Sequence, residues 1–267
     1  IVILRYPTAD ASSYAVTGTL DTVANTAYPI ANTAYYKLNG GSGTTVTDSS
    51  GNGYNGTASN LSPYAAGRFG QAAVFNGTSS IIDIPLNVVS PASAYTVSLW
   101  FNCNDITVNQ GIFTNIGTST QAGEIAINIT GSNQISIYSA TGTNNDVNIL
   151  NVTPSTSLSN DSWFNLVVIS DRTLSNRGQV FINGTEGAYS YNPGPGSNGQ
   201  YSTAKIGVSD NRYFNGSIDQ VRIFNSALSA GNVTSLYNEG TVVESTDGTD
   251  SILQFVGGTG NVTFTKT

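Results

Sequence analysis

The sequence predicts an all-β protein, a two-sheet antiparallel sandwich with extended strands at both ends of the chain. Seven Asn-Gly pairs supply the positive-φ residues that tight hairpin turns need. Between them run short segments of alternating apolar and polar residues, with almost no helical periodicity. Charged residues make up only 9% of the 267 residues, against about 25% in an ordinary globular domain. One large sandwich with additions fits this length, and a second full domain does not.

Apolar segments mark the expected strands in chain order. Residues 1–7, IVILRYP, form a first strand, and an imperfect repeat, ANTAYPI followed by ANTAYY, spans residues 24–36. The repeat fits either a linker with duplicated turns or an arm that adds a strand to a neighbouring subunit. Further strands are expected at residues 95–101 (YTVSLWF) and 163–171 (WFNLVVISD), and a hairpin at 179–184 (QVFING).

The segment at residues 214–237, FNGSIDQVRIFNSALSAGNVTSLY, joins an Asn-Gly turn, a strand and a short helix. Alternation places Asp219, Val221 and Ile223 on one face of the strand, so the carboxylate is expected on the apolar side. A buried carboxylate needs a metal, a cation or backbone N–H groups as its partner, because leaving it unpaired costs on the order of several kcal/mol. Ser229 is predicted to cap the helix.

This closing segment resembles the G-x-I-D-x-V-R-I-Y-x-x-x-L-S strand and helix that end laminin-G-like domains of the concanavalin-A-like lectin/glucanase superfamily. Residues 36–57 (YKLNGGSGTTVTDSSGNGYNGT) are similar to the opening strand and D-x-S-G-N-G-x-x-G turn of that family. Residues 67–77 (GRFGQAAVFNG) are similar to its G-x-F-G-x-A-x-x-F-x-G motif. With the strands named above, these motifs stand in the expected order. The resemblance implies a concanavalin-A-like jelly roll, a fold that hosts enzymes, lectins, adhesins and spacers.

The two ends of the chain resemble a different class of protein. Residues 1–7 are similar to the G-I-V-I-x-R-Y-P strand that closes glycine-rich repeats of bacteriophage fibres and adhesins, and residues 252–265 (ILQFVGGTGNVTFT) to the opening strands of such repeats. The chain then divides into an N-terminal arm with a fibre-type strand and linker (1–34), a jelly roll (35–239) and C-terminal strands (240–267), which the resemblance makes the start of a further repeat. Because the chain contains no methionine, we expect an internal or processed piece of a longer polypeptide.

Composition argues against several classes of partner. The net charge is −7 and the nine basic residues are scattered, so no basic stripe is available for nucleic acid. No apolar run approaches the roughly 20 residues needed to cross a bilayer, and membrane insertion is not expected. The single cysteine, Cys103, cannot form an internal disulfide. We expect a location at a virion surface or outside the cell.

The residue types that most enzymes need are missing. The chain contains no histidine, which removes Ser-His and Cys-His triads and histidine-ligated zinc. Glycoside hydrolases of the superfamily that the chain resembles carry two glutamates on one strand, as E-x-D-x-E or E-x-D-x-x-E. None of the four glutamates here has a neighbouring acid at that spacing. The sequence therefore predicts a protein that is not an enzyme.

The resemblance also implies a structural calcium site. Related sandwiches hold one Ca²⁺ between the first and last strands, using a late acidic side chain that matches Asp219 and oxygens from the opening turn. The matching early segment contains Asn39, Gly41 and Asp48, and hard oxygen ligands of this kind suit Ca²⁺. Many relatives have an acidic residue at the position of Asn39, so the charge of the site is lower here. The alternative is that Asp219 and Asp48 accept hydrogen bonds from backbone N–H groups of turns.

A candidate ligand site comes from aromatic residues in loops, because protein–sugar contacts favour aromatic faces beside amide and hydroxyl groups. Tyr189, Tyr191 and Tyr201 surround a Pro/Gly-rich loop. Arg212 and Tyr213 come just before the last strand, on an expected rim. These five residues are the predicted ligand-binding residues.

Together these features predict a non-enzymatic adhesion or decoration module of a phage or virus appendage or capsid. Its expected partners are host surface polysaccharide and other virion or fibre subunits. Two alternatives stay open: a purely structural virion spacer or assembly protein, and a carbohydrate-binding module of a secreted bacterial adhesin or polysaccharide-degrading protein. Terminal strands that pair with other subunits favour assembly, whereas strands that fold back as one edge favour a free-standing module.

Overall fold

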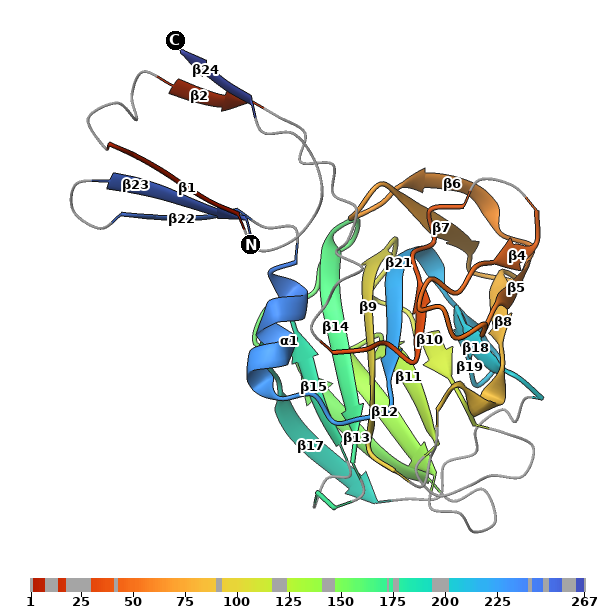
Figure 1. The fold of residues 1–267 in the computed structure, drawn as a ribbon. Coiled ribbons are helices and arrows are strands. Elements are labelled where there is room, and N and C mark those ends of the chain that lie inside the picture. The colour runs from red at the N-terminus through yellow and green to blue at the C-terminus, as the bar shows by residue number, and fades with distance from the viewer. Residues whose placement is uncertain are drawn as a thin grey trace.

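Two antiparallel sheets face each other across a hydrophobic core (Figure 1), so the predicted all-β jelly-roll sandwich is confirmed. The computed structural model describes residues 2–7, 14–17, 30–40, 43–89, 93–116, 124–140, 147–171, 173–174, 178–193, 202–239, 242–246, 250–255 and 263–266. Among them, no helix is long and apolar enough to cross a membrane.

One layer of the sandwich is a nine-stranded sheet. Its strands, in spatial order, are β17 (Ala188–Pro193), β13 (Val147–Thr153), β12 (Gln134–Ala140), β11 (Ile125–Thr130), β10 (Gln110–Thr114), β18 (Ala204–Ile206), β8 (Ile81–Ile84), β5 (Gly56–Ser59) and β4 (Thr45–Val46). A 3₁₀ turn, η2 (Leu86–Val88), follows β8.

The other layer is an eight-stranded sheet. Its strands, in spatial order, are β16 (Thr185–Glu186), β15 (Gly178–Ile182), β14 (Trp163–Ser170), β9 (Tyr95–Cys103), β21 (Asn215–Phe224), β7 (Gln71–Asn76) and β6 (Ser62–Ala66), and β3 (Ala34–Tyr36) pairs with β21. A separate two-stranded pair consists of β19 (Val208–Ser209) and β20 (Arg212–Tyr213). The last residues of the sequence repeat thus add a strand to their own sandwich.

Alternation along the strands fills the space between the two sheets. On β9, Val97, Leu99 and Phe101 belong to the main core, whereas Trp100 belongs to a smaller cluster on the outer face of the eight-stranded sheet. The residues predicted as strands at 95–101 and 163–171 are β9 and β14, which pair with each other antiparallel. Both predictions are confirmed.

A helix covers part of the outer face of the eight-stranded sheet (Figure 1). It is α1 (Ala230–Tyr237), and its buried residues Val233 and Leu236 pack against Val167 of β14 and its neighbours. The Ser229 side chain accepts a hydrogen bond of 3.3 Å from a backbone N–H of the first turn. The predicted N-cap is confirmed.

The strand β21 contains a β-bulge that simple alternation does not predict. Asp219 pairs with Trp100 of β9, but Arg222 pairs with Ser98, so two residues of β21 lie opposite one residue of β9. Gln220, within the bulge, has a φ of +53°. A bulge of this kind inserts one residue into the period-two pattern and bends the strand.

The bulge reverses the predicted side of the carboxylate. The sequence predicts Asp219 on the apolar side with Val221 and Ile223, and that prediction is wrong. Directly paired residues share a face of the sheet, so Asp219 lies on the outer face with Trp100. Val221 and Ile223 belong to the core. The inserted residue puts the later side chains of β21 on the opposite face from the one that alternation assigns.

The Asn-Gly pairs are not all turns. Asn183 and Gly184 have φ values of +51° and +76° and form the turn between β15 and β16, as predicted. Asn215 and Gly216, however, belong to β21. Gly216 is required there for a different reason, since a Cβ on it would lie 2.1 Å from the carbonyl oxygen of Asn102.

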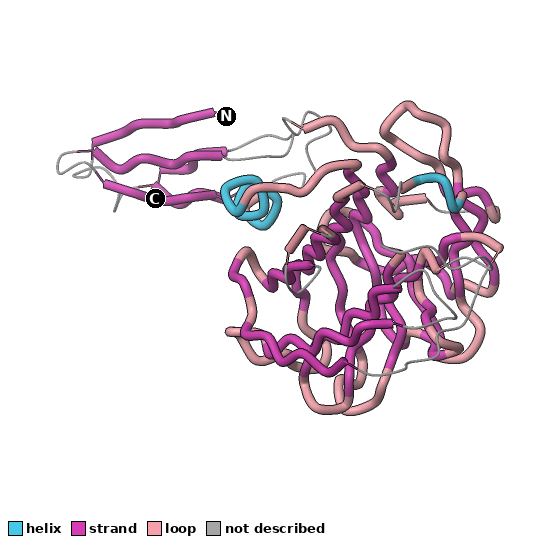
Figure 2. The backbone as a smooth tube through the Cα atoms, turned by 90° about the horizontal axis from the view of Figure 1, so that it is seen from below, coloured by secondary structure: helices cyan, strands magenta, loops and turns pink. Residues whose placement is uncertain are grey.

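The terminal strands form small sheets of their own, drawn clear of the sandwich in Figures 1 and 2. A three-stranded sheet has the order β1 (Val2–Pro7), β23 (Asp250–Phe255) and β22 (Val242–Thr246), and β2 (Tyr14–Thr17) pairs with β24 (Thr263–Lys266). The predicted extended strands at both ends are confirmed. They pair with each other, so they do not fold back as an edge of the sandwich.

Candidate functional site

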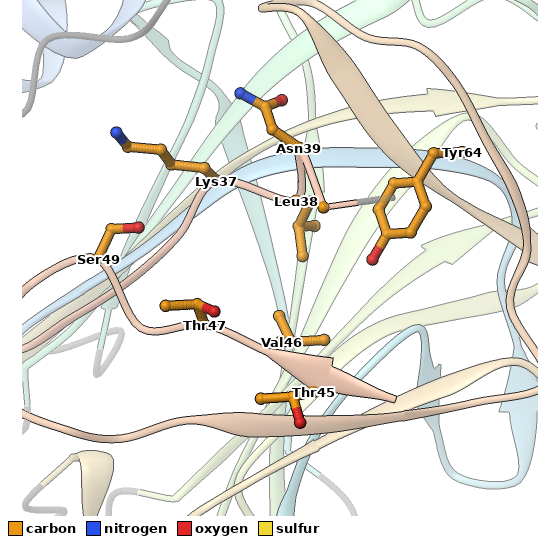
Figure 3. A pocket seen from close by; sticks show the side chains of 9 residues that line it. Lys37, Leu38, Asn39, Thr45, Val46, Thr47, Ser49 and Tyr64 are labelled. Atoms are coloured by element: carbon orange, nitrogen blue, oxygen red, sulfur yellow. The ribbon is translucent and has the colours of Figure 1, made fainter. Parts of the chain in front are cut away.

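A pocket of about 210 Å³ opens at the side of the sandwich where β4 ends the nine-stranded sheet and β6 ends the eight-stranded sheet. Residues 37–40 and 45–47, Ser49 and Tyr64 line it (Figure 3). This volume lies below the range of about 300–1,000 Å³ that is typical for drug-sized ligands. The pocket therefore suits a single small unit, and we call it the edge pocket.

The edge pocket has an apolar floor and a polar rim. Leu38 and Val46 are 3% and 5% exposed and belong to the main core. Figure 3 shows Leu38 directed toward Val46, with Lys37 and Tyr64 on opposite sides of them. Leu38 has a φ of +56°, which non-glycine residues rarely adopt. This turn of the backbone buries Leu38 while Lys37 and Asn39, its chain neighbours, stay partly exposed.

The remaining rim groups are hydroxyls. Thr45, Thr47 and Ser49 are exposed, and the ring of Tyr64 is half-buried against the core. Burial raises the pKa of the Tyr64 hydroxyl, so this group is a neutral hydrogen-bond donor and acceptor at pH 7. The rim thus combines one aromatic ring with hydroxyl, amide and ammonium groups.

Asn39 fixes the pocket to the neighbouring turn at residues 67–71. Its Oδ1 accepts the backbone N–H of Gln71 at 3.0 Å. Gly70, which has a φ of +68°, leaves room for the Asn39 amide, because a Cβ there would lie 3.3 Å from two of its atoms. The Nδ2 of Asn39 donates no hydrogen bond to the described residues, and Figure 3 shows the amide directed away from Leu38 and Val46.

Asp219 reaches the same turn from the outer face of β21. The residue is fully buried, and its Oδ2 accepts the N–H of Phe69 at 2.8 Å, while Oδ1 accepts no hydrogen bond from the described residues. Burial raises the pKa of Asp219 to about 7, against the partial compensation of hydrogen bonds such as that from Phe69. Gly67 borders the carboxylate, since a Cβ on it would lie 2.8 Å from Oδ2.

Asp48 organises a different turn. Its Oδ1 accepts the N–H groups of Tyr35 and Ser50, both at 2.9 Å, and its Oδ2 accepts the Ser50 hydroxyl at 2.8 Å and the Tyr54 N–H at 3.0 Å. Burial alone raises the pKa of Asp48, but these four hydrogen bonds outweigh it and the net shift is downward. Asp48 is therefore ionised and fully hydrogen-bonded, as the alternative prediction describes.

The predicted calcium ligands fit a metal unequally. Asp219 has one oxygen without a hydrogen bond, whereas both oxygens of Asp48 and the Oδ1 of Asn39 already accept N–H or O–H groups. Gly41 lies outside the described residues. Within the described ranges, no three His, Cys, Asp or Glu side chains gather as a metal site would need. Ca²⁺ takes 6–8 oxygens, so the calcium prediction rests on Asp219 and on ligands other than Asp48.

The structure does not bring the predicted ligand-binding residues together by any contact among the described side chains. The Tyr189 hydroxyl donates to a carboxylate oxygen of Glu186 and accepts the N–H of Val180, and the Tyr189 ring packs partly against the core. Arg212 forms an ion pair of 3.1 Å with Asp210, beside Tyr213 on the short strand β20. Tyr191 lies on β17, but its side chain, like all of Tyr201, lies outside the description.

Sequence reasoning missed Lys37, Thr45, Thr47 and Tyr64 as site residues. Lys37 lies just after β3, the two threonines flank Val46 in β4, and Tyr64 lies in β6. The local signal was the alternation T-V-T, which predicts two outward hydroxyls on a half-buried strand. Nothing local indicates that this strand meets Tyr64, because that proximity depends on which strands form the sheet edges.

The two-sheet architecture defines a jelly-roll β-sandwich. A comparison with protein-family profiles matches residues 75–234 to the concanavalin A-like lectin/glucanases superfamily, and the chain belongs to that superfamily. A search of curated protein sequences finds no match.

Solved structures share this fold. Domain 4 of AbnA, an extracellular GH43 arabinanase from Geobacillus stearothermophilus solved with arabinotriose, aligns at a TM-score of 0.56 and 24% identity, over 77% of this chain and 98% of that domain. The botulinum neurotoxin serotype D binding domain aligns at a TM-score of 0.54 and 16% identity, over 82% of this chain and 52% of that one. The type G receptor binding domain gives 0.55 and 15%, over 78% and 51%. The chain thus spans about half of the neurotoxin domains.

Proposed function

We propose that this protein is a carbohydrate-binding module without enzymatic activity, serving adhesion at a surface outside the cell or on a virion. The observation that carries the proposal is the edge pocket. It places the Tyr64 ring and the side chains of Thr45, Thr47 and Ser49 around an apolar floor. Sugars present apolar C–H faces and many hydroxyls, which such a rim complements. The arabinanase domain solved with arabinotriose supports this class of ligand for the fold.

The absence of catalysis is part of the proposal. Glycoside hydrolysis needs two carboxyl groups about 5–9.5 Å apart on either side of the scissile bond. The described lining of the edge pocket contains no Asp or Glu. Asp48 and Asp219, the nearby acids, are buried in hydrogen-bonded positions within the scaffold. Their arrangement supports a structural role.

The test is binding of the purified chain to an array of surface glycans, with calcium and again with chelator. Specific binding that Tyr64→Ala abolishes and Tyr213→Ala preserves would support the edge pocket. If only Tyr213→Ala abolishes binding, the ligand-binding site is formed by the loop residues predicted from the sequence and not by the edge pocket. If the folded protein binds no glycan under either condition, the carbohydrate proposal fails.

A second candidate function is assembly, as a spacer or decoration that joins neighbouring subunits of a phage or virus appendage. The observation that favours it is the terminal three-stranded sheet, whose outer strands β1 and β22 each have one edge that pairs with no described strand. Such edges accept a further strand. Light scattering of the full chain tests this candidate: a stable oligomer supports it, and a monomer at high concentration contradicts it.

A further inference from the structure

We infer that the edge pocket takes a sugar unit carrying a carboxylate, such as a uronic or sialic acid, and that Lys37 binds the carboxylate. This inference rests on the carbohydrate-binding function proposed above and names the class of sugar. Lys37 is half-exposed at the rim, and the described lining offers no acidic side chain to neutralise it. An ammonium group beside a hydroxyl-rich pocket favours an anionic ligand over a neutral one.

Three other cations among the described residues of the sandwich are paired with acids. Lys205 pairs with Asp83, Arg212 with Asp210 at 3.1 Å, and the buried Arg222 with Glu239 at 2.8 Å. Lys37 and Arg68, by contrast, form no ion pair with any acid among the described residues. Both cations therefore have no acidic partner within the described part of the sandwich. An external anion would complete their pairing.

Aromatic rings hold both cations in place of acids. The guanidinium of Arg68 lies 4.7 Å from the Trp100 ring centroid and 5.2 Å from that of Phe69. The Nζ of Lys37 lies 5.8 Å from the Tyr35 ring centroid. Tyr35, Phe69 and Trp100 form one buried cluster, so both cations contact the same group of aromatic side chains. Cation–π contacts position a charge without neutralising it, which leaves it able to attract an anion.

The same region is connected to the pocket by hydrogen bonding. Arg68 belongs to the turn at residues 67–71, which Asn39 holds through its bond to Gln71 N. The exposed hydroxyls of Thr45 and Thr47 remain for the ring hydroxyls of the sugar. A pocket of about 210 Å³ suits one sugar unit, so Lys37 at the rim meets a substituent of that unit.

The test compares matched acidic and neutral oligosaccharides by calorimetry with the full chain. The pairs are trigalacturonate with galactotriose, and sialyllactose with lactose. The variants are Lys37→Gln and the control Lys205→Gln, which removes the same charge from a residue already paired with Asp83. Lys37→Gln is expected to weaken acidic-sugar binding about tenfold or more, and Lys205→Gln to leave it within about twofold. Raising the salt to 0.5 M is expected to weaken wild-type binding.

Each other outcome overturns the inference in a distinguishable way. If the acidic and the neutral sugar of each pair bind equally well, the proposal of carbohydrate binding stands, but the inferred preference for acidic sugars is wrong. If acidic sugars bind the Lys37→Gln variant as tightly as wild type, Lys37 does not bind the carboxylate and the edge pocket is not the site of acidic sugars. If neither these sugars nor the broad array gives binding, the proposed function fails and the inference falls with it.

Discussion

The buried carboxylate of Asp219 gives a prediction whose sign depends on pH. Its side chain is fully buried and holds the N–H of Phe69 at 2.8 Å. Asparagine has the same shape and keeps an oxygen for that N–H, but it carries no charge. We therefore expect Asp219→Asn to leave stability nearly unchanged at pH 4 and to increase it at pH 8.

The magnitude follows from the raised pKa. Burial raises the pKa of Asp219 from 3.8 to about 7, so the folded state binds a proton that the unfolded state has lost. The stability that this group contributes is complete below about pH 3.8 and is lost as the pH rises through 7. The two pKa values differ by about 3 units, which corresponds to on the order of 4 kcal/mol at pH 8.

Urea unfolding followed by tryptophan fluorescence at pH 4, 6 and 8 measures the effect. The difference between Asp219→Asn and wild type should grow with pH. Asp48→Asn is the control with opposite sign, because the pKa of Asp48 is lowered and its stabilisation is lost as the pH falls. A difference for Asp219→Asn that is the same at pH 4 and pH 8 refutes the reasoning.

Calcium at pH 8 should stabilise wild type and not Asp219→Asn if Asp219 is a ligand.

Three further predictions concern the scaffold around the site. Glu239→Gln removes the carboxylate that lies 2.8 Å from buried Arg222 and should cost about 3 kcal/mol, seen as a drop of about 6–12 °C in a thermal melt; an unchanged melting temperature would contradict a buried ion pair. Asp48→Ala removes four hydrogen bonds and should lower the free energy of unfolding in urea by about 3 kcal/mol, and a loss below about 1 kcal/mol would disprove its structural role. Gly67→Ala places a Cβ 2.6 Å from the Gln71 backbone and should lower the stability measured by thermal melting by about 2 kcal/mol. In the control Gly40→Ala the new Cβ meets nothing within 4 Å, so stability should not change; equal effects of the two substitutions would contradict the close approach at Gly67.

Local patterns predicted the elements of this fold well. The Ser229 cap and the Asn183–Gly184 turn depend on residues a few positions apart, so the sequence contains their whole cause. The β9 and β14 strands are long apolar runs whose ends coincide with the predicted ones to within two residues. These features needed no knowledge of the tertiary structure.

The site was harder to predict because its causes are not local. The bulge puts Gln220, a non-glycine residue, at positive φ. No glycine or asparagine at this position indicates the bulge in the sequence. Without the bulge, Asp219 is assigned to the wrong face. Likewise, Lys37 and Tyr64 meet at one pocket only because β4 and β6 end their sheets on the same side. Sheet order is a property of the whole chain, so motif spacing does not reveal it.

The pairing of the terminal strands has a mechanical consequence. β1 pairs with β23 from Val2↔Phe255 to Pro7↔Asp250, so the whole sandwich lies inside the loop that this pair closes. Tension applied to the two ends of the chain passes first through the hydrogen bonds of β1 with β23 and of β2 with β24. The sandwich bears no load until those strands separate. The paired terminal strands therefore keep tension applied at the chain ends from reaching the sandwich and its edge pocket until they separate.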